Sequence, residues 1–360
     1  MSSAKILVFG TGVLLRGLIA DCAEKARMPI TMVSSTPSGD ERARALQASG
    51  GKFTLRERGL GSDGSVVDTA REVAIIERAL TARDDGEAIA ATAHDPEIQI
   101  VISNVSESGF QLTEPKNLSF PGRLAAWLRA RMAAGAPGVT VLPSELIAEN
   151  GKKLRAMIAE CDPDPAFQAW LDSTCIFCNT LVDRICTQDD TDPLAAVVEP
   201  YTFWAIQGEN SGALGTLAAA NPDAIVVADS IERFALRKVR ILNGLHTAMA
   251  SIGPSQYGVT TVREALEHPI LGPWLESLLH DEILPAICPP LERSDADAFA
   301  KLTLLRMRNP FLVHKLSQIA VGAAAKWEAR LLPTMAAFAE RFGRAPEKLA
   351  ACREAFLTAH

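Results

Sequence analysis

The sequence lacks a hydrophobic run long enough to cross a membrane, for which about 18 consecutive apolar residues are needed. The nearest approach, residues 6–20, is interrupted by glycines and by Arg16. The same stretch has no small-residue cleavage site, and Asp21 stands before Cys22 where a lipoprotein signal would have a small residue. We therefore expect neither a signal peptide in this stretch nor a membrane partner.

Cysteine and positive charge are also scarce. Seven cysteines in 360 residues fit free thiols in a reducing, cytoplasmic compartment better than a disulfide framework. Lysine and arginine number 36 against 43 aspartate and glutamate residues, which gives a formal net charge of −7. The chain therefore has no excess of positive charge to hold a polyanion, and nucleic acid is not an expected partner.

The remaining composition is that of an ordinary globular protein, with 48% hydrophobic and 22% charged residues. Apolar runs predict strands, and helical spacing predicts helices that alternate with them. A glycine-punctuated segment, residues 50–75, predicts hairpins. The predicted strands are residues 5–9, 30–34, 98–102 and 139–142, and the predicted helices are residues 13–26, 79–93 and 121–134. Such alternation indicates an α/β domain with a mostly parallel sheet.

The pattern changes after about residue 225, where helical spacing dominates and few β-branched runs remain. The helical segments are residues 231–251, 262–266, 273–287, 296–305, 311–331 and 333–341. We therefore predict one domain at residues 1–224 and a mainly α-helical domain at residues 225–360.

A glycine turn follows the first predicted strand. Gly10 and Gly12 precede a helix that starts at Val13, and glycines at this point let the backbone approach a pyrophosphate at the helix N-terminus. Leu15 replaces the usual third glycine, although Gly17 could allow close packing of the helix. A plain tight turn is the alternative. The position at the start of a βαβ unit favours a Rossmann-like domain that binds a dinucleotide.

The second predicted strand ends without the carboxylate that usually holds the adenosine ribose of NAD. Asp40 and Glu41 lie a few residues beyond the position where that carboxylate is usual, and Arg42 and Arg44 follow them. A basic residue here would suit the 2′-phosphate of NADP, so the choice between NAD and NADP stays open.

Lys238, Asn243 and His246 lie in the first predicted helix of the second domain. At 100° per residue, Asn243 lies about 140° and His246 about 80° from Lys238, so all three fit one side of a helix. Burial would lower the pKa of this lysine and make it a general acid/base near neutral pH. Asn243 and His246 could donate hydrogen bonds to a substrate oxygen. The alternative is a solvated basic helix face with a core histidine.

The segment 237–248, Arg-Lys-Val-Arg-Ile-Leu-Asn-Gly-Leu-His-Thr-Ala, resembles the signature of the polyol-specific long-chain dehydrogenase/reductase, or mannitol dehydrogenase, family. Further similar motifs follow in the family's order along most of the chain, and several resemble its uronate branch. They are residues 9–17, 102–109, 142–151, 177–185, 204–208 and 306–310.

This resemblance implies an NAD-linked, metal-independent oxidoreductase, with NADP not excluded, that acts on a small sugar acid or polyol. It implies that Lys238 is the general acid/base and that Asn243 and His246 orient the reacting oxygen. The implied reaction reduces a keto-hexuronate, D-tagaturonate, to D-altronate, with Arg306 or Arg308 pairing with the carboxylate. The expected cofactor contacts are Phe9, Gly10, Gly12, Val13, Leu14, Ser103, Asn104 and Glu107. The expected substrate contacts are Asn179, Arg306, Asn309 and His314.

Two alternative functions stay open at this point. A hexitol dehydrogenase of the mannitol 2-dehydrogenase type would prefer an uncharged polyol, and a non-catalytic sensor would bind the dinucleotide without turnover. Cys175 and Cys178 have the spacing of a metal-binding pair, but with only Cys186 nearby we interpret them as thiols, because structural zinc sites need four ligands. The sequence predicts no oligomeric state.

Overall fold

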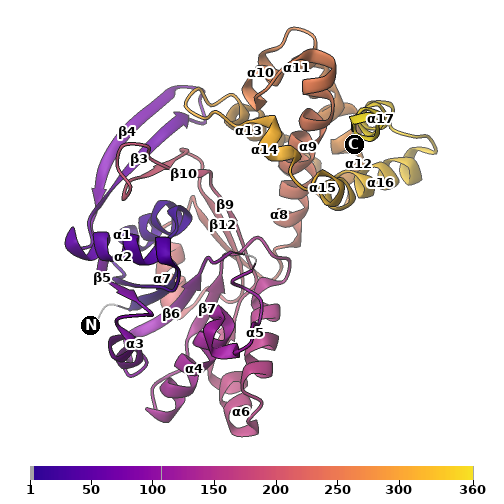
Figure 1. Ribbon diagram of the computed structural model, residues 1–360. Helices are drawn as coiled ribbons and strands as arrows, with labels where there is room; N and C mark the ends of the chain where they lie inside the picture. The colour runs from indigo at the N-terminus through magenta and orange to yellow at the C-terminus, as the bar shows by residue number, and fades with distance from the viewer. Residues whose placement is uncertain (1–3, 107, 360) are drawn as a thin grey trace. The chain divides into compact units, whose positions relative to one another are not determined.

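The computed structural model describes residues 4–106 and 108–359, and these form two compact units (Figure 1). The first unit comprises the described part of residues 1–57 together with residues 68–231. The second comprises residues 58–67 together with the described part of residues 232–360. The domain boundary between residues 224 and 225 remains a sequence prediction.

The first unit is built on a six-stranded sheet in which every neighbouring pair of strands is parallel. Its strands, in spatial order, are β5 (Ile76–Thr81), β2 (Ile30–Ser34), β1 (Lys5–Phe9), β6 (Ile98–Ser103), β7 (Thr140–Pro143) and β8 (Ile176–Phe177). The carboxyl ends of β1, β2 and β6 therefore lie at the same edge of the sheet. The predicted α/β fold with a mostly parallel sheet is confirmed.

One predicted helix is wrong at its start. Residues 79–81 belong to strand β5, and the helix α3 (Gly86–Thr92) begins only after a turn. Ala79 pairs with Met32 of β2 in parallel register, and Ala79 and Leu80 are buried. The pairing and burial of this segment override the helix preference of Ala79 and Leu80, because strand formation depends mainly on packing context.

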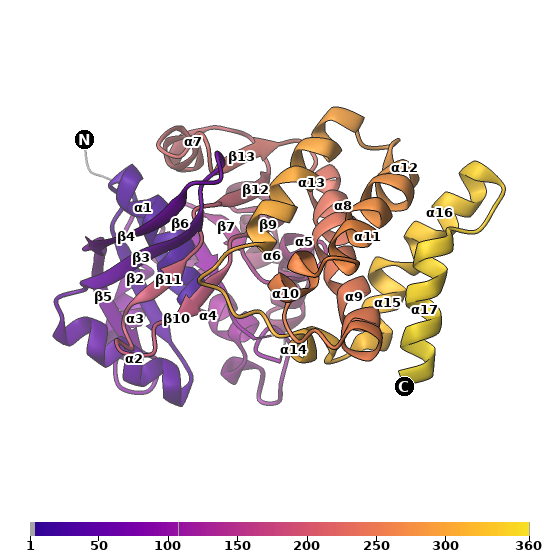
Figure 2. The same cartoon turned by 90° about the horizontal axis from the view of Figure 1, so that it is seen from above.

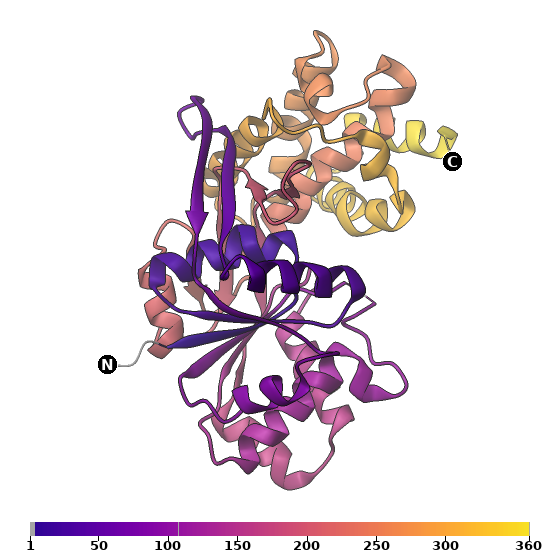
Figure 3. The same ribbon diagram turned by 60° about the vertical axis from the view of Figure 1, so that its left-hand side comes forward.

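Helices cover both faces of this sheet, as Figure 3 shows. In β1, Ile6 and Val8 face one hydrophobic core while Leu7 and Phe9 face the other, as expected from the alternation of side chains along a strand. The first core includes residues of the π-helix η1 (Leu15–Ala20), α1 (Asp21–Ala26), α2 (Pro37–Ala48) and α7 (Gly212–Ala219). The second includes residues of α4 (Phe120–Ala133), α5 (Asn150–Cys161) and α6 (Pro165–Thr174). Both faces of the sheet are buried, which explains why its strands are continuous apolar runs.

Two smaller sheets and a short 3-10 helix, η2 (Lys116–Leu118), complete the strand-bearing part of the chain. One sheet has the order β10 (Cys186–Gln188), β11 (Ala196–Val198), β3 (Phe53–Leu60) and β4 (Val66–Val73). The other has the order β13 (Ile225–Ala228), β12 (Phe203–Gln207) and β9 (Thr180–Asp183). Strands β3 and β4 are the hairpin predicted within residues 50–75.

A buried ion pair ties the helix after the glycine turn to the region of the small sheets. Arg184 donates to the Asp21 carboxylate at 2.7 Å and to Glu57 at 3.0 Å. Burial alone would raise the pKa of the Asp21 carboxyl, but the positive charges of Arg184, Lys25 and Arg71 lower it below its ordinary value. The ionised carboxylate is thus held in place by its cationic neighbours.

The second unit consists of helices and contains the tip of the β3–β4 hairpin. Its central helix, α9 (Asn243–Ile252), contacts α10 (Val262–Glu267), α14 (Leu316–Ala320), α15 (Ala323–Arg330) and α17 (Glu347–Ala359), an arrangement that can be followed in Figure 2. The helices before and after α9 are α8 (Glu232–Arg237), η3 (Lys238–Leu242), η4 (Gly253–Tyr257), α10 (Val262–Glu267), α11 (Leu271–Leu278), η5 (Leu279–Ile283), α12 (Leu284–Ile287), α13 (Arg293–Met307), α14 (Leu316–Ala320), α15 (Ala323–Arg330), α16 (Leu332–Phe342) and α17 (Glu347–Ala359). Within the described part of the chain, no helix combines the length and apolar character needed to span a membrane.

Candidate active site

A cavity of about 360 Å³ opens at the carboxyl edge of the parallel sheet in the first unit. Its walls come from the ends of β1, β2 and β6 and from the segments that follow them, and they include residues 9–12, 33–36 and 104–106. Ligands of open α/β sheets bind at this edge, where adjacent strands lead into different connections. The cavity is thus the candidate dinucleotide site.

The two glycines of the turn have different roles. Gly10 has φ of +118°, and a Cβ atom there would lie 2.7 Å from Leu15 Cδ1 and 3.0 Å from the Asn104 carbonyl oxygen. A side chain at Gly10 is therefore excluded by both conformation and space. A Cβ atom at Gly12 would meet nothing within 4 Å, so open space lies in front of this backbone. The turn fits a pyrophosphate lying against the start of the helix.

The predicted cofactor contacts have different surroundings. Phe9, Gly10, Gly12 and Asn104 line the cavity. Val13 and Leu14 pack partly buried against the core and are not among its lining residues. Ser103 is buried, and the last predicted residue, Glu107, lies outside the described residues.

Glu145 supports the floor of this cavity and was not among the predicted site residues. It follows β7, is 4% exposed, and accepts hydrogen bonds from the Val105 backbone N–H at 2.9 Å and the Ser103 hydroxyl at 3.1 Å. Burial raises the pKa of its carboxyl above the ordinary value, against the lowering effect of these hydrogen bonds. An acidic residue two positions after an apolar strand was the available sequence signal.

The wall expected to face the adenosine ribose contains hydroxyl groups and a guanidinium. Ser34, Ser35, Thr36 and Arg42 line it, and none of the described lining residues of the cavity is acidic. The Nε atom of Arg42 is buried and has no hydrogen-bond partner among the described residues. This wall fits a ribose hydroxyl or a 2′-phosphate, in keeping with the open choice between NAD and NADP.

In the second unit, the helix that bears Lys238, Asn243 and His246 is not a regular α-helix. Residues Lys238–Leu242 form a π-helical turn, and the Asn243 backbone N–H donates to the Lys238 carbonyl five residues earlier. The regular spacing used in the sequence prediction is therefore wrong across this turn. A bond between residues i and i+5 places Asn243 above Lys238, and such π turns occur often at functional sites. The turn brings the half-buried Lys238 and Asn243 onto the same side of the helix.

His246 lies on the next turn of this helix and is 8% exposed. Its ring stands edge-on to the ring of His314, with 4.8 Å between the ring centroids. Burial lowers the pKa of His246 well below its ordinary value, and His314, Arg306 and Arg330 lower it further. The imidazole is therefore neutral near pH 7 and can donate one hydrogen bond from its N–H.

The remaining predicted substrate residues have different surroundings. Arg306 is buried and close enough for its charge to lower the pKa of His246, as is the partly buried His314. The Asn309 amide donates to the Arg58 carbonyl at 3.1 Å, and its oxygen accepts the Phe311 N–H at 2.9 Å. These contacts favour an anchoring role for Asn309 at the hairpin tip.

Two further candidates for substrate binding are already engaged by neighbouring side chains. Asn179, in the first unit, donates to Gln207 at 2.9 Å and accepts the Lys152 N–H at 3.1 Å. Arg308 forms an ion pair with Glu276 at 2.5 Å. The suggestion that Arg308 pairs with a substrate carboxylate is therefore not supported, because its guanidinium already has an acidic partner.

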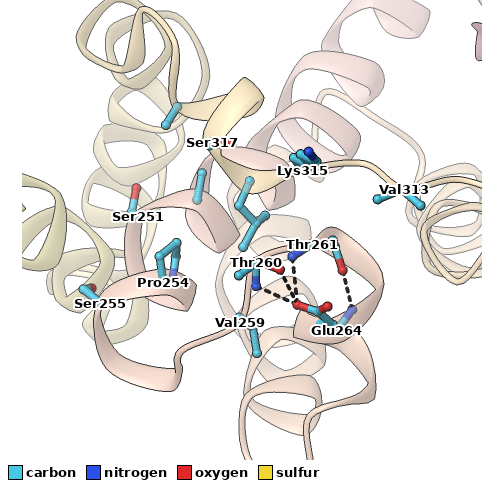
Figure 4. A pocket seen from close by; sticks show the side chains of 13 residues that line it. Ser251, Pro254, Ser255, Val259, Thr260, Thr261, Glu264, Val313, Lys315 and Ser317 are labelled. Carbon is cyan, nitrogen blue, oxygen red and sulfur yellow. Dashed lines mark hydrogen bonds between the residues drawn. The ribbon is translucent and has the colours of Figure 1, made fainter.

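A second cavity, of about 730 Å³, lies within the helical unit beside α9 (Figure 4). Ala250 and Ser251 of α9 line it, as do Val313 and Lys315, the two neighbours of His314. Ala250 follows His246 by one helical turn, so the cavity lies along the same face of α9. Its one acidic lining residue among those described, Glu264, binds the start of α10 through Thr260 and Thr261, as the dashed lines in Figure 4 show.

The predicted thiols are free. Cys175, Cys178 and Cys186 form no disulfide, and burial raises the pKa of Cys178 to about 11 and of Cys186 to about 12. Within residues 4–106 and 108–359, no group of three or more histidine, cysteine or acidic residues is arranged to hold a metal ion.

A parallel sheet with a glycine-turn cavity, followed by a helical unit with a lysine–asparagine–histidine helix, defines a dinucleotide-dependent dehydrogenase of two domains. Comparison with known families agrees. The mannitol dehydrogenase Rossmann domain matches residues 4–216, and the mannitol dehydrogenase C-terminal domain matches residues 230–356. The chain belongs to the mannitol dehydrogenase family of oxidoreductases.

Curated relatives narrow this assignment. The altronate oxidoreductase of Bacillus subtilis is 34% identical over 96% of this chain and 77% of its own length. The altronate oxidoreductase of Klebsiella pneumoniae strain 342 is 31% identical over the same shares of the two chains. The predicted resemblance to the uronate branch of the family is thereby confirmed.

Solved structures show the same fold. A D-sorbitol dehydrogenase in substrate-free form aligns with a TM-score of 0.85 at 20% identity, covering 99% of this chain and 80% of that one. Mannitol 2-dehydrogenase of Pseudomonas fluorescens, in a ternary complex with NAD and D-mannitol, aligns with a TM-score of 0.78 at 20% identity, covering 99% and 79%.

Proposed function

We propose that this chain is an NAD(H)-dependent tagaturonate reductase, or altronate oxidoreductase, which interconverts D-tagaturonate and D-altronate. The observation that supports this most directly is its similarity to altronate oxidoreductases over 96% of its length, at up to 34% identity among the relatives compared.

The residues of the helical unit suit the chemistry of ketone reduction. A bound nicotinamide cofactor supplies the hydride that reduces the carbonyl carbon. The Lys238 ammonium gives its proton to the carbonyl oxygen, so that ketone, hydride and proton together yield the alcohol. Asn243 and the neutral imidazole of His246 donate hydrogen bonds to this oxygen as negative charge develops on it. These donors provide the electrophilic assistance for which other dehydrogenases use a metal ion.

The first unit holds the cofactor in this proposal. Gly12 offers open backbone for the pyrophosphate, and the conformation of Gly10 makes the turn possible. Asn104 donates from its amide to the Ser144 carbonyl at 3.0 Å, so its backbone and side chain are fixed at the wall of the cavity. These contacts support binding of the dinucleotide in this cavity.

A panel of substrates tests the proposal. The purified protein is mixed with NADH or NADPH and with D-tagaturonate, D-fructuronate or D-fructose, and loss of the reduced cofactor is followed by absorbance. We expect the highest kcat/KM with D-tagaturonate and NADH. A higher value with fructose would instead identify a hexitol dehydrogenase of the mannitol 2-dehydrogenase type. Binding of NADH without oxidation by any of the three compounds would identify a non-catalytic sensor.

A further inference from the structure

Basic side chains gather around His246 in the second unit. Arg306 on α13, His314 before α14 and Arg330 on α15 all lie close enough to lower the pKa of His246. Lys326, one turn before Arg330 on α15, is close enough to lower the pKa of His314. Burying several basic groups together is unfavourable unless an anion joins them. An anionic partner is therefore expected for Arg330.

Arg330 stands out in this group because its guanidinium has few partners. It is half-buried and donates to the Thr247 hydroxyl at 3.2 Å. Among the described residues, no carboxylate forms an ion pair with Arg330 or with Lys326, whose ammonium donates to the Ile319 carbonyl at 2.8 Å. A guanidinium carries five N–H donors, so most of the hydrogen-bonding capacity of Arg330 is left for another group.

Other arginines of this chain use their N–H donors to bind carboxylates. Arg129 binds Asp162 and Asp164, each at 2.8 Å, and Arg308 binds Glu276. Burial lowers the pKa of Arg330, and no acidic neighbour in the described part of the chain counters that effect. Arg330 is thus a partly desolvated cation whose natural partner, an anion, has not been supplied by the described protein residues.

The helix that bears Lys238 and Asn243 fixes the position of Arg330. Arg240, two residues after Lys238, donates to the carbonyl oxygens of Ala329 and Arg330 at 2.6 and 2.9 Å and thereby caps the end of α15. The Thr247 hydroxyl that accepts from Arg330 donates in turn to the Asn243 carbonyl at 2.9 Å. These contacts hold Arg330 beside the helix that bears Lys238 and Asn243.

We propose that Arg330, assisted by the charge of Lys326, binds the carboxylate of the sugar-acid substrate. This inference rests on the proposed function, because an uncharged hexitol would give the guanidinium no partner. It assigns recognition of the acid to α15 and leaves proton transfer to the helix of Lys238. A planar guanidinium with free N–H groups matches a carboxylate through two parallel hydrogen bonds.

Steady-state kinetics of Arg330→Gln and Arg330→Lys test the assignment with D-tagaturonate and with uncharged D-fructose. We expect Arg330→Gln to raise the KM for tagaturonate about 10- to 100-fold, the size expected for loss of a charge-assisted contact, with a smaller rise for Arg330→Lys. The constant for product inhibition by D-altronate should rise in parallel, whereas any turnover of fructose should keep its KM. Arg353→Gln, which removes an exposed arginine on α17, is the matched control.

Unchanged tagaturonate KM in Arg330→Gln would overturn the role of Arg330, and so would a KM for fructose that rises as much as the KM for tagaturonate. The wild-type protein distinguishes the two proposals. If it reduces no keto-hexuronate, the proposed function fails; if it reduces tagaturonate while Arg330→Gln matches it, only the assignment of Arg330 fails.

Discussion

Replacing Glu145 by alanine tests whether the cofactor cavity depends on one buried carboxylate. The change leaves the Val105 N–H and the Ser103 hydroxyl without their partner, and each unsatisfied buried donor costs about 1–3 kcal/mol. Two such donors give about 2–6 kcal/mol, but removing a carboxylate whose burial is itself unfavourable offsets part of this. We therefore expect a loss of about 2–3 kcal/mol in the free energy of unfolding.

Urea unfolding and fluorescence titration with NADH measure the two consequences. Because Val105 lines the cavity, NADH should bind more weakly to Glu145→Ala than to the wild type. Glu149→Ala is the matched control, since Glu149 is exposed and pairs with Lys152 on the surface, where such pairs contribute about 0–1 kcal/mol. If Glu145→Ala retains wild-type stability and NADH affinity, the supporting role of this carboxylate is refuted.

Three further predictions concern pH, an ion pair and a close contact. The folded state keeps His246 neutral, whereas in the unfolded chain this histidine takes up a proton near its ordinary pKa of 6.5, so the free energy of unfolding should fall as the pH drops below 6.5. His246→Gln should flatten this pH dependence in urea unfolding. The same pH dependence in His246→Gln as in the exposed control His280→Gln would contradict the prediction. Arg184→Met removes the buried partner of the Asp21 carboxylate, which keeps its ion pairs with Arg71 and Lys25, and should cost about 3 kcal/mol, the lower end for a broken buried ion pair, whereas wild-type stability would refute this. A Cβ atom at Gly17 would lie 2.6 Å from a neighbouring valine, so Gly17→Ala should cost about 1–3 kcal/mol in the same assay, and Gly86→Ala, where nothing lies within 4 Å, should not.

Much of the first unit could be predicted because its signals are local. The apolar run before Gly10 and the helix that starts at Val13 specify a βαβ unit in a few residues. The close packing anticipated for Gly17 is also found, against Val198 and Cys186 of the small sheet. In contrast, the end of strand β5 escaped prediction because Ala79 and Leu80 favour a helix and only pairing with β2 makes them part of a strand.

The site was less predictable because it depends on geometry that a residue pattern does not contain. A regular helical repeat cannot reveal the π turn that places Asn243 above Lys238. The spacing of Glu145 from Ser103 along the chain gives no sign that their side chains meet. Arg330 belongs to no recognised motif, and its significance comes from the lack of an acidic partner among the described residues, which is a property of the folded chain.

Turnover by Lys238→Ala tests the central claim, that this lysine exchanges a proton with the substrate oxygen. Oxidation of NADH by D-tagaturonate is measured for the wild type, for Lys238→Ala and for Lys301→Ala, which changes an exposed lysine of α13. We predict that Lys238→Ala lowers kcat by about 10²–10⁴-fold, as expected for loss of a general acid/base, while NADH affinity and the activity of Lys301→Ala remain those of the wild type. Near-normal turnover in Lys238→Ala would contradict the account.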